Sequence, residues 1–303
     1  MTSILCSGSI ALDTTRTPFK TVENVLGGAA SFFSLAASFF ASVHILSVVG
    51  KDFPEEYWKL LEKKANLNGV QKKEGKTFHY DSTFSFDLYH RQTNKTELNV
   101  LGEFEPVLTG EAKKCEFVYL ATMPPEKQLK VLQEAKGRKL VFMDTIEFYI
   151  KTERNALLKT MSHVDGVVLN DAEARMLTDE VNLIKCGKKI HALGPKIVII
   201  KKGEHGCLLF HDGKVIPFPA FPLEVIIDPT GAGDAFAGGF LGYLAKIFKQ
   251  DTRPTTQDFK TAMAYANVMG SLAVEDFSVN KLASATKEEV EKRFREYCEL
   301  LRI

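Results

Sequence analysis

The order of apolar and polar positions predicts strands alternating with helices along most of the chain. Short β-branched or apolar runs are followed by segments with the apolar spacing of amphipathic helices. Such alternation is typical of βαβ units, which build a largely parallel sheet with helices on both faces. The predicted strands are 4–10, 43–49, 117–120, 140–143, 164–169 and 197–201. The predicted helices are 54–65, 126–135, 152–161 and 171–177.

The segment from Thr77 to Glu103 departs from this alternation. Apolar side chains at Phe84, Phe86 and Leu88 alternate with polar ones, and a period of two is typical of strands with one apolar face. The sequence therefore predicts a separate small sheet within the α/β series. We interpret this sheet either as a lid over a ligand site or as a flap for dimer packing, and the two roles are compatible.

A second stretch also lacks helical spacing, but no boundary between domains is visible. Residues 208–225 include Asp212-Gly213, a dipeptide that favours a tight turn between antiparallel strands. No repeat, low-complexity tract or linker rich in Pro, Gly and Ser divides the sequence. We therefore expect one domain over 1–303, with a small β-lid formed from about 13–26 and 77–103.

Composition narrows the classes of partner. The 303 residues include 39 Lys and Arg against 38 Asp and Glu, which gives a formal net charge of +1 at pH 7. Proteins that bind nucleic acids usually carry a basic excess, because phosphate contacts supply much of their affinity. We therefore expect no nucleic-acid partner.

Signals for export or for a membrane are absent from the sequence. The longest apolar stretch, 29–49, is interrupted by serines and a histidine, which favours a small-residue helix and a buried strand over a membrane span. The first residues lack the basic segment of a signal peptide. The 5 cysteines are scattered without metal-ligand spacing. We therefore expect a cytoplasmic protein with reduced thiols and no membrane partner.

The strongest chemical signal is the segment Asp228-Pro-Thr-Gly-Ala-Gly-Asp234, which precedes a helix rich in small residues. Glycines let the backbone approach a ligand, and the first amides of a helix have no partner within it. An anion such as a phosphate is the natural occupant of this positive helix end. Asp234 would stand beside the phosphate as the general base for an attacking hydroxyl, and its alternative role is that of a helix N-cap.

Further polar residues follow the predicted strands. Asp13, Asp144 and Asn170 stand at or just beyond strand ends, and parallel α/β sheets bind their ligands at that edge. We expect these three side chains to surround one crevice. Asn170 and Glu173 are three positions apart at a helix start, so they either order a metal-bound water or form an N-cap pair.

Two common phosphate-binding motifs are missing. Gly75-Lys76-Thr77 lacks the earlier glycine of a P-loop, because that position is Val70. The Gly-x-Gly-x-x-Gly pattern of dinucleotide-binding sheets does not follow the first predicted strand. An NAD-dependent dehydrogenase is therefore disfavoured.

Several motifs, in the same order along the chain, resemble those of the ribokinase/PfkB family of carbohydrate and nucleoside kinases. The segment Asp228–Asp234 is similar to the family signature Asp-Thr-x-Gly-Ala-Gly-Asp. The other matching segments are Gly8 to Asp13, Gly27-Gly28, Val49-Gly-Lys-Asp52, Asn170-x-x-Glu173, Lys202-Gly203-x-x-Gly206 and Asn267. The resemblance implies a three-layer αβα core with a mostly parallel sheet, a small β-sheet lid, ATP as donor and Mg²⁺ as metal.

The resemblance also implies roles for individual residues. Asp234 matches the base that deprotonates the acceptor hydroxyl, and the amides of Gly231, Ala232 and Gly233 match the anion hole for the moving γ-phosphoryl group. The positions that match substrate contacts are Asp13, Gly27 and Gly28.

On the donor side, the resemblance assigns Lys201, Gly203 and Gly206 to the phosphates and ribose of the nucleotide and Asn267 to the adenine. Asn170 and Glu173 match the pair that orders Mg²⁺ and its waters. Asp228 and Thr230 match positions near a monovalent-cation site in some members, which makes K⁺ dependence an expectation of the resemblance.

One departure bears on the acceptor. Phe32 stands where family members commonly carry an Asn that binds a substrate hydroxyl. An aromatic ring there favours an acceptor with a flat or apolar portion, such as a nucleoside base, or a lid contact. Pro229 replaces the usual Thr, and because proline only restricts φ, we expect no loss of activity.

The leading hypothesis is an ATP-dependent kinase that phosphorylates a hydroxyl, expected to be a hydroxymethyl group, of a sugar or sugar-like small molecule. A nucleoside kinase is the alternative within this class. A non-catalytic nucleotide- or sugar-binding protein is less favoured, because the Gly231 to Asp234 segment is intact. A homodimer through the β-lid is predicted from the apolar residues Phe84, Phe86 and Leu88.

Overall fold

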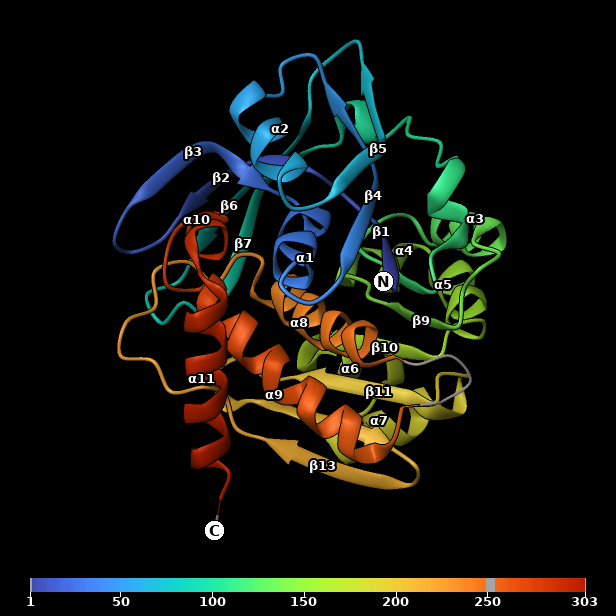
Figure 1. Cartoon of the computed structure of the whole chain (residues 1–303), viewed down its shortest axis with the longest axis vertical. Coiled ribbons are helices and arrows are strands. Elements are labelled where there is room, and N and C mark those ends of the chain that lie inside the picture. The colour runs from blue at the N-terminus through green and yellow to red at the C-terminus, as the bar shows by residue number, and fades with distance from the viewer. Residues whose placement is uncertain (1, 249–253, 303) are drawn as a thin grey trace.

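A nine-stranded sheet forms the centre of the computed structural model, which describes residues 2–248 and 254–302 (Figure 1). From β11 to β5 neighbouring strands are parallel, and β12 and β13 extend the sheet as an antiparallel hairpin. In spatial order the strands are β13 (Lys214–Phe218), β12 (Cys207–His211), β11 (Ile197–Lys201), β10 (Gly166–Asn170), β9 (Leu140–Met143), β8 (Phe117–Leu120), β1 (Ser3–Ser7), β4 (Ser42–Gly50) and β5 (Asn66–Lys73).

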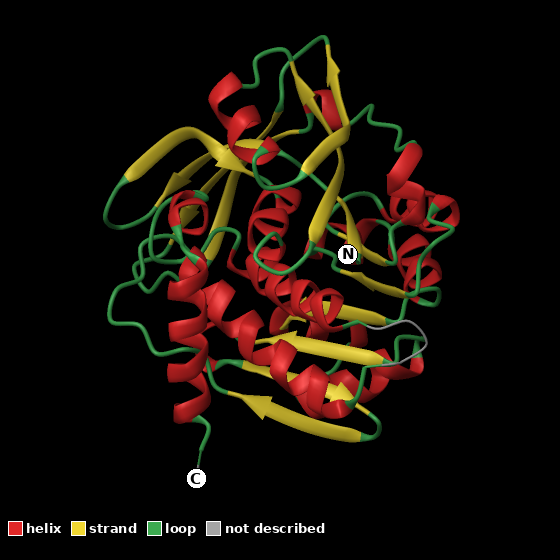
Figure 2. Ribbon diagram, in the orientation of Figure 1, coloured by secondary structure: helices red, strands yellow, loops and turns green. Residues whose placement is uncertain are grey.

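Helices cover both faces of this sheet (Figure 2). Successive side chains of a strand point to opposite faces, so Ile197 and Ile199 of β11 lie in one hydrophobic core and Val198 and Ile200 in the other. The helices of the first core are α1 (Ala29–Ala37), α2 (Glu55–Glu62), α8 (Ala232–Ile247), α9 (Thr256–Ala273), α10 (Asn280–Ser284) and α11 (Lys287–Leu300). Those of the second are α3 (Pro125–Glu134), α4 (Glu147–Thr152), α5 (Arg154–Met161), α6 (Asp171–Thr178) and α7 (Leu183–Ala192). The predicted three-layer αβα core is confirmed.

A separate four-stranded sheet has the order β3-β2-β6-β7. Its strands are β2 (Ala11–Arg16), β3 (Thr21–Gly27), β6 (Phe78–Phe84) and β7 (Arg91–Glu97). The chain enters this sheet after β1 and again after β5, two parallel strands whose carboxyl ends share one edge of the large sheet. The small sheet therefore lies at the edge where α/β sheets bind ligands.

Most predicted elements of the core agree with the structure, and one N-terminal prediction is wrong. The predicted strands 117–120, 140–143 and 197–201 coincide with β8, β9 and β11. The predicted strand 4–10 ends earlier, at Ser7, and the chain then crosses into the small sheet. At Gly8 an added Cβ atom would lie 2.7 Å from the Cβ atom of Ala121, so the glycine permits this crossing beside β8.

The period-two prediction across Phe84, Phe86 and Leu88 is also wrong. Strand β6 ends at Phe84, residues 85–90 form a loop, and Leu88 has a φ of 56°. Phe84 is buried within the chain whereas Phe86 is 89% exposed, so the three side chains do not form one strand face. The observation behind the predicted homodimer is therefore absent.

Three further features bear on the sequence predictions. Asp212 and Gly213, with φ values of 50° and 71°, join the antiparallel strands β12 and β13, as their turn chemistry predicts. None of the helices in the described ranges combines the length and apolarity needed to cross a bilayer. All of the cysteines are free thiols.

Candidate active site

The start of helix α8 forms the centre of the candidate site. Gly231 is its N-cap with a φ of 75°, in the left-handed region that glycine adopts without a steric penalty. The amide of Ala232 donates to the Pro229 carbonyl (3.2 Å), and the first amide bonded back into the helix is that of Ala235, which donates to the Gly231 carbonyl (2.9 Å). Asp234 lies in the first turn, so its alternative role as N-cap is wrong.

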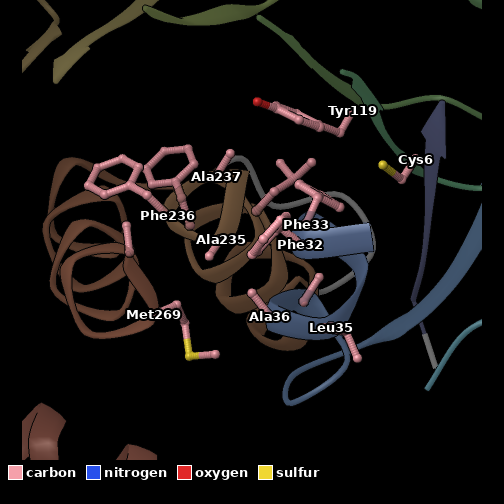
Figure 3. Close-up of a cluster of buried hydrophobic side chains, with 14 of the residues drawn as sticks. Cys6, Phe32, Phe33, Leu35, Ala36, Tyr119, Ala235, Phe236, Ala237 and Met269 are labelled. Atoms are coloured by element: carbon pink, nitrogen blue, oxygen red, sulfur yellow. The ribbon is translucent and has the colours of Figure 1, made fainter. Parts of the chain in front are cut away.

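Phe32 of α1 packs directly against this turn. A Cβ atom on Gly231 would overlap the Phe32 ring, and Phe32 is 1% exposed. Figure 3 shows Phe32 and Phe33 in the contact between α1 and α8. The predicted surface for a flat acceptor is therefore not available at Phe32, because the ring fills the space beneath the glycine turn.

Lys201, the last residue of β11, reaches the same turn from the sheet. A Cβ atom on Gly233 would lie 2.5 Å from the Nζ atom of Lys201, so the ammonium group lies against the start of α8. Burial raises the pKa of Asp234, and the positive charges of Lys201 and Arg91 lower it. The site thus combines a partly buried carboxylate with a cation at a helix N-terminus, where an anion is favoured.

A second carboxyl group, Asp144 at the end of β9, lies beside Asp234. Burial raises the pKa of Asp144, and the negative charge of Asp234 raises it further. The interaction with the Asp144 carboxyl group is among the causes that lower the pKa of Asp234, after the charges of Lys201 and Arg91. The hydroxyls of Tyr119 and Thr122 donate to Asp144 at 3.0 and 3.2 Å.

The Tyr119 ring lies deep in the core. It is 1% exposed and stacks on Phe33 with ring centroids 4.3 Å apart. The strand-end position of Asp144 is visible in the sequence, whereas no motif marks Tyr119 or Thr122. Only the register of β8 beside β9 brings their hydroxyls to this carboxyl group.

Asp13 of β2 provides a carboxylate from the small sheet. It is 5% exposed, and its pKa is raised to about 7 by burial and by the negative charge of Asp228, against the lowering effect of Arg91. A Cβ atom on Gly27 would overlap the Asp13 carboxylate. Gly28, with a φ of 90°, begins α1 next to the backbone of Ser9. The Asp13 Oδ1 atom has no hydrogen-bond partner among the described residues, so it is free to accept one from a ligand.

Asn170 and Glu173 form a complete capping box at the start of α6. The Glu173 amide donates to Asn170 Oδ1 (2.7 Å), and the Asn170 amide donates to Glu173 Oε2 (2.8 Å). The N-cap interpretation of this pair is therefore confirmed, and it leaves Glu173 Oε1 outside these two bonds. Burial raises the pKa of Glu173 to about 7, and the charge of Lys201 lowers it.

This acidic group fits a divalent cation that keeps most of its waters. In the described part of the chain, no three His, Cys, Asp or Glu side chains lie close enough to hold an ion by themselves. Mg²⁺ usually binds through one or two carboxylates together with waters and substrate phosphates. A single buried carboxylate such as Glu173 matches that coordination pattern.

Asp228 and Thr230 form a buried turn before α8. The Thr230 amide donates to Asp228 Oδ1 (2.9 Å), and the Ser278 amide donates to Asp228 Oδ2 (3.5 Å). Burial raises the pKa of Asp228. Thr230 Oγ1 is buried and has no partner among the residues that the structure describes, so the pair offers oxygen ligands suited to a cation.

The remaining predicted donor residues are Gly203, Gly206 and Asn267. Gly203 and Gly206, with φ values of 58° and 79°, form the turn between β11 and β12, and a Cβ atom on Gly206 would overlap the Phe218 carbonyl. Asn267 on α9 is 7% exposed, and its Nδ2 atom donates to the Met263 carbonyl (2.8 Å). Local packing thus accounts for both Gly206 and the amide nitrogen of Asn267.

Arg91, which lies outside every motif of the family resemblance, contributes its charge to the site from the small sheet. It is exposed at the start of β7, with its guanidinium carbon 5.3 Å from the ring centroid of Tyr80. Its charge opposes the effect of burial on the pKa of Asp13, Glu173 and Asp234. No local motif signals this role, because it depends on how the small sheet is placed over the large one.

Comparisons with known proteins agree with this geometry. The family model described as pfkB family carbohydrate kinase matches residues 1–286. The cytidine kinase of Thermococcus kodakarensis is 34% identical over 254 residues, which cover 80% of this chain and 89% of that protein. A nucleoside kinase of Methanocaldococcus jannaschii is 25% identical over 270 residues, which cover 81% of this chain and 84% of that protein.

Solved structures show the same fold at lower identity. The nucleoside kinase of Methanocaldococcus jannaschii, described as an archaeal member of the ribokinase family, superposes with a TM-score of 0.77 at 22% identity, over 98% of this chain and 99% of that one. A nucleoside kinase of Burkholderia thailandensis in complex with inosine has a TM-score of 0.77 at 18% identity, over 97% and 98% of the two chains. With the site motifs in place and the family model spanning nearly the whole length, the chain belongs to the pfkB family of carbohydrate kinases.

Proposed function

We propose that this chain is an ATP-dependent kinase that transfers the γ-phosphoryl group to the hydroxymethyl group of a nucleoside, with cytidine as the first acceptor to test. The observation that carries the proposal is the partly buried Asp234 carboxylate in the first turn of α8, beside a glycine turn and the Lys201 ammonium group. Family membership makes the chain a phosphotransferase with an alcohol acceptor. The names of the related cytidine and nucleoside kinases favour a nucleoside over a free sugar.

Asp234 would accept the proton of the attacking hydroxyl. Burial raises its pKa and so strengthens it as a base, while Lys201 and Arg91 favour its ionised form. Burial and the negative charge of Asp234 raise the pKa of Asp144, which favours the neutral form of Asp144 beside Asp234. The carboxyl pair therefore supports the base role of Asp234.

The start of α8 would stabilise the transferring phosphoryl group. The amides of Gly231 and Gly233, together with the Lys201 ammonium group, supply positive charge where negative charge develops. The amide of Ala232 is the weakest member of the predicted anion hole, since it already donates to Pro229.

The acceptor would bind between α1 and the small sheet. The unpartnered Asp13 Oδ1 atom can accept a hydrogen bond from a ribose hydroxyl, and Gly27 and Gly28 allow the ligand and this carboxylate to come close. A neutral hydroxyl group is a suitable donor to the Asp13 carboxylate, whose pKa is about 7 without a ligand. The hydrogen bond from the hydroxyl would favour the ionised form of Asp13.

The donor would lie along the carboxyl ends of β10 and β11. We assign its phosphates and ribose to Lys201, Gly203 and Gly206, and the water shell of Mg²⁺ to Asn170 and Glu173. Bound Mg²⁺ would neutralise charge on the phosphates. Asn267 would contribute to the adenine side only through its amide oxygen, because its nitrogen is bonded to Met263.

Three secondary proposals accompany this function. Asp228 and Thr230 would bind a monovalent cation, K⁺, through the unpartnered Thr230 Oγ1 atom.

The small sheet would act as the lid of the acceptor site, and its polar edge strand β7 leaves the predicted homodimer without an apolar contact face. The free thiols are compatible with the cytoplasm as the compartment.

The test is a panel of nucleosides, free sugars and sugar phosphates, each assayed for ADP release with ATP and Mg²⁺. Asp234→Asn serves as the blank for contaminating kinases. Cytidine or another nucleoside is expected to have the highest kcat/KM. A free sugar or sugar phosphate with a higher kcat/KM would replace the nucleoside as acceptor, and ATP binding without ADP release across the whole panel would contradict kinase activity.

A further inference from the structure

The loop between β6 and β7 reaches from the small sheet to the turn after β11. A Cβ atom on Gly203 would lie 3.6 Å from Cε2 and 3.9 Å from Cδ2 of Tyr89, which is ordinary van der Waals contact. Gly203 begins the short 3₁₀ turn Gly203–His205, two residues beyond Lys201. The tip of the proposed acceptor lid therefore lies next to the turn proposed to hold the nucleotide.

Hydrogen bonds within the loop hold Tyr89 in this position. The Ser85 amide donates to the His90 carbonyl (2.9 Å), and the His90 amide donates to Ser85 Oγ (3.0 Å). The Tyr89 amide donates to Asp87 Oδ1 (3.0 Å). A loop closed by its own bonds presents its side chains with little further loss of conformational entropy.

The Tyr89 side chain keeps a free surface beside Gly203. It is 48% exposed, and its ring meets the His90 ring edge to face with centroids 5.2 Å apart. An aromatic ring with a phenolic hydroxyl offers both apolar contact and a hydrogen bond to a ligand. Because residue 203 is a glycine, no side chain from this position covers the Tyr89 ring.

Arg91, two positions later, carries a positive charge that acts on both halves of the site. It opposes the effect of burial on the pKa of both Glu173, on the donor side, and Asp13, on the acceptor side. Residues 89–91 thus combine a ring beside Gly203 with a cation whose charge acts on both proposed ligand sites.

We propose that Tyr89 is a donor-site residue supplied by the acceptor lid, with its ring against Gly203 and its free face and hydroxyl toward the ribose or phosphates of ATP. This inference rests on the proposed kinase function. Its consequence is that donor binding and lid position are coupled, so each ligand would strengthen the binding of the other by the same factor.

The first experiment compares Tyr89→Ala with Phe86→Ala, a matched control in the same loop whose side chain is 89% exposed. Calorimetry with a non-hydrolysable ATP analogue and Mg²⁺, without acceptor, measures the donor site alone. Tyr89→Ala is expected to raise the dissociation constant about 5- to 10-fold, the loss of one aromatic contact. Phe86→Ala should change it less than about 2-fold, within the range of neutral surface substitutions.

A reporter variant tests the contact without relying on a loss of affinity. The sequence contains a single tryptophan, Trp58 on α2, so Tyr89→Trp in a Trp58→Phe background has one emitter at the lid tip. The ATP analogue alone is expected to shift its emission. An unchanged spectrum at saturating analogue, or equal affinities for Tyr89→Ala and wild type, would overturn the inference.

The proposed function fails in a different way. Wild-type protein that binds no ATP analogue would contradict the kinase proposal itself. Wild-type protein that binds the analogue while Tyr89→Ala binds it equally well would contradict only the role of Tyr89.

Discussion

The start of α8 and the small sheet contribute to the same candidate site by different means. At α8, four consecutive residues, Gly231 to Asp234, provide the turn, the helix amides and the carboxylate. The small sheet contributes Asp13 and Arg91, which are far apart in sequence and belong to one sheet because β2 pairs with β6 and β6 with β7. Local backbone geometry thus builds the phosphate side, whereas strand pairing builds the acceptor side.

In the proposed function, this difference assigns phosphoryl transfer to the α8 turn and selection of the acceptor to the small sheet. The α8 turn is buried against Phe32 and has little freedom to change. The small sheet has an exposed edge strand and an exposed loop, where substitutions cost little stability. We therefore expect substitutions at the α8 turn to abolish turnover and those in the small sheet to alter affinity and pH dependence.

Asp234→Asn should give the largest effect. Loss of the base is expected to lower kcat about 10³- to 10⁴-fold, about 4 to 5 kcal/mol, with the fold retained. Single-turnover assays measure the rate, and circular dichroism with thermal unfolding checks the fold. A variant that keeps more than about a tenth of wild-type kcat would break the assignment of chemistry to the α8 turn.

Lys201→Met should follow. Removing the ammonium group beside Gly233 takes away positive charge at the anion site, and kcat/KM is expected to fall about 10²-fold, about 3 kcal/mol. Lys202→Met is the matched control, since it removes the neighbouring charge, and it should retain kcat/KM within about 3-fold. Equal losses in the two variants would indicate a general charge effect.

The buried Asp13 predicts a dependence of stability on pH. Its pKa rises from 3.8 when unfolded to about 7 when folded, so the folded protein holds this proton more tightly. The stability that protonated Asp13 contributes is complete below about pH 4, falls as the pH rises, and is lost above about pH 7. Urea unfolding without ligands measures this dependence. Between pH 5 and pH 8, Asp13→Asn should lose less unfolding free energy than wild type, by on the order of 2 kcal/mol.

Two results bear on the burial of Asp13. Added acceptor should reduce the difference in pH dependence between wild type and Asp13→Asn, because a bound hydroxyl favours the ionised carboxylate. Identical pH profiles for wild type and Asp13→Asn would show that Asp13 is not buried by the small sheet in solution.

Arg91→Gln should give the smallest effect. Arg91 is exposed, so its loss is expected to lower kcat/KM about 10-fold, about 1.4 kcal/mol, and less at high salt. Lys95→Gln on the same strand is the control and should leave kcat/KM within about 2-fold. A loss of kcat/KM as large as that of Lys201→Met would indicate that Arg91 takes part in phosphoryl transfer and not only in binding the acceptor. The contrast between the two regions would then be weaker.

Much of the core could be predicted from the sequence. Strands buried on both faces are continuous apolar runs, so β8, β9 and β11 have the predicted bounds. The prediction was wrong at 4–10 and at Phe84 to Leu88, where apolar residues continue past the end of a strand. Periodicity cannot distinguish a strand that continues from a chain that leaves the sheet, because both bury apolar side chains.

The candidate site divides in the same way. Gly231, Gly233 and Asp234 are visible in the sequence, because a left-handed turn and a helix N-terminus require particular residues at fixed spacing. The burial of Phe32, the raised pKa of Asp144 and the hydrogen bond from Tyr119 to Asp144 depend on side chains from separate elements. These contacts have no local pattern.

By itself, the sequence determined the α/β core and the phosphate turn of this protein, because strand periodicity and backbone conformation are properties of neighbouring residues. Tertiary structure alone decided which side chains reach that turn. Lys201 meets Gly233 only once α8 packs on the large sheet, and Tyr89 lies beside Gly203 only once the two sheets are packed together. Pairing of distant strands sets these distances, and burial then sets the pKa of each carboxyl group.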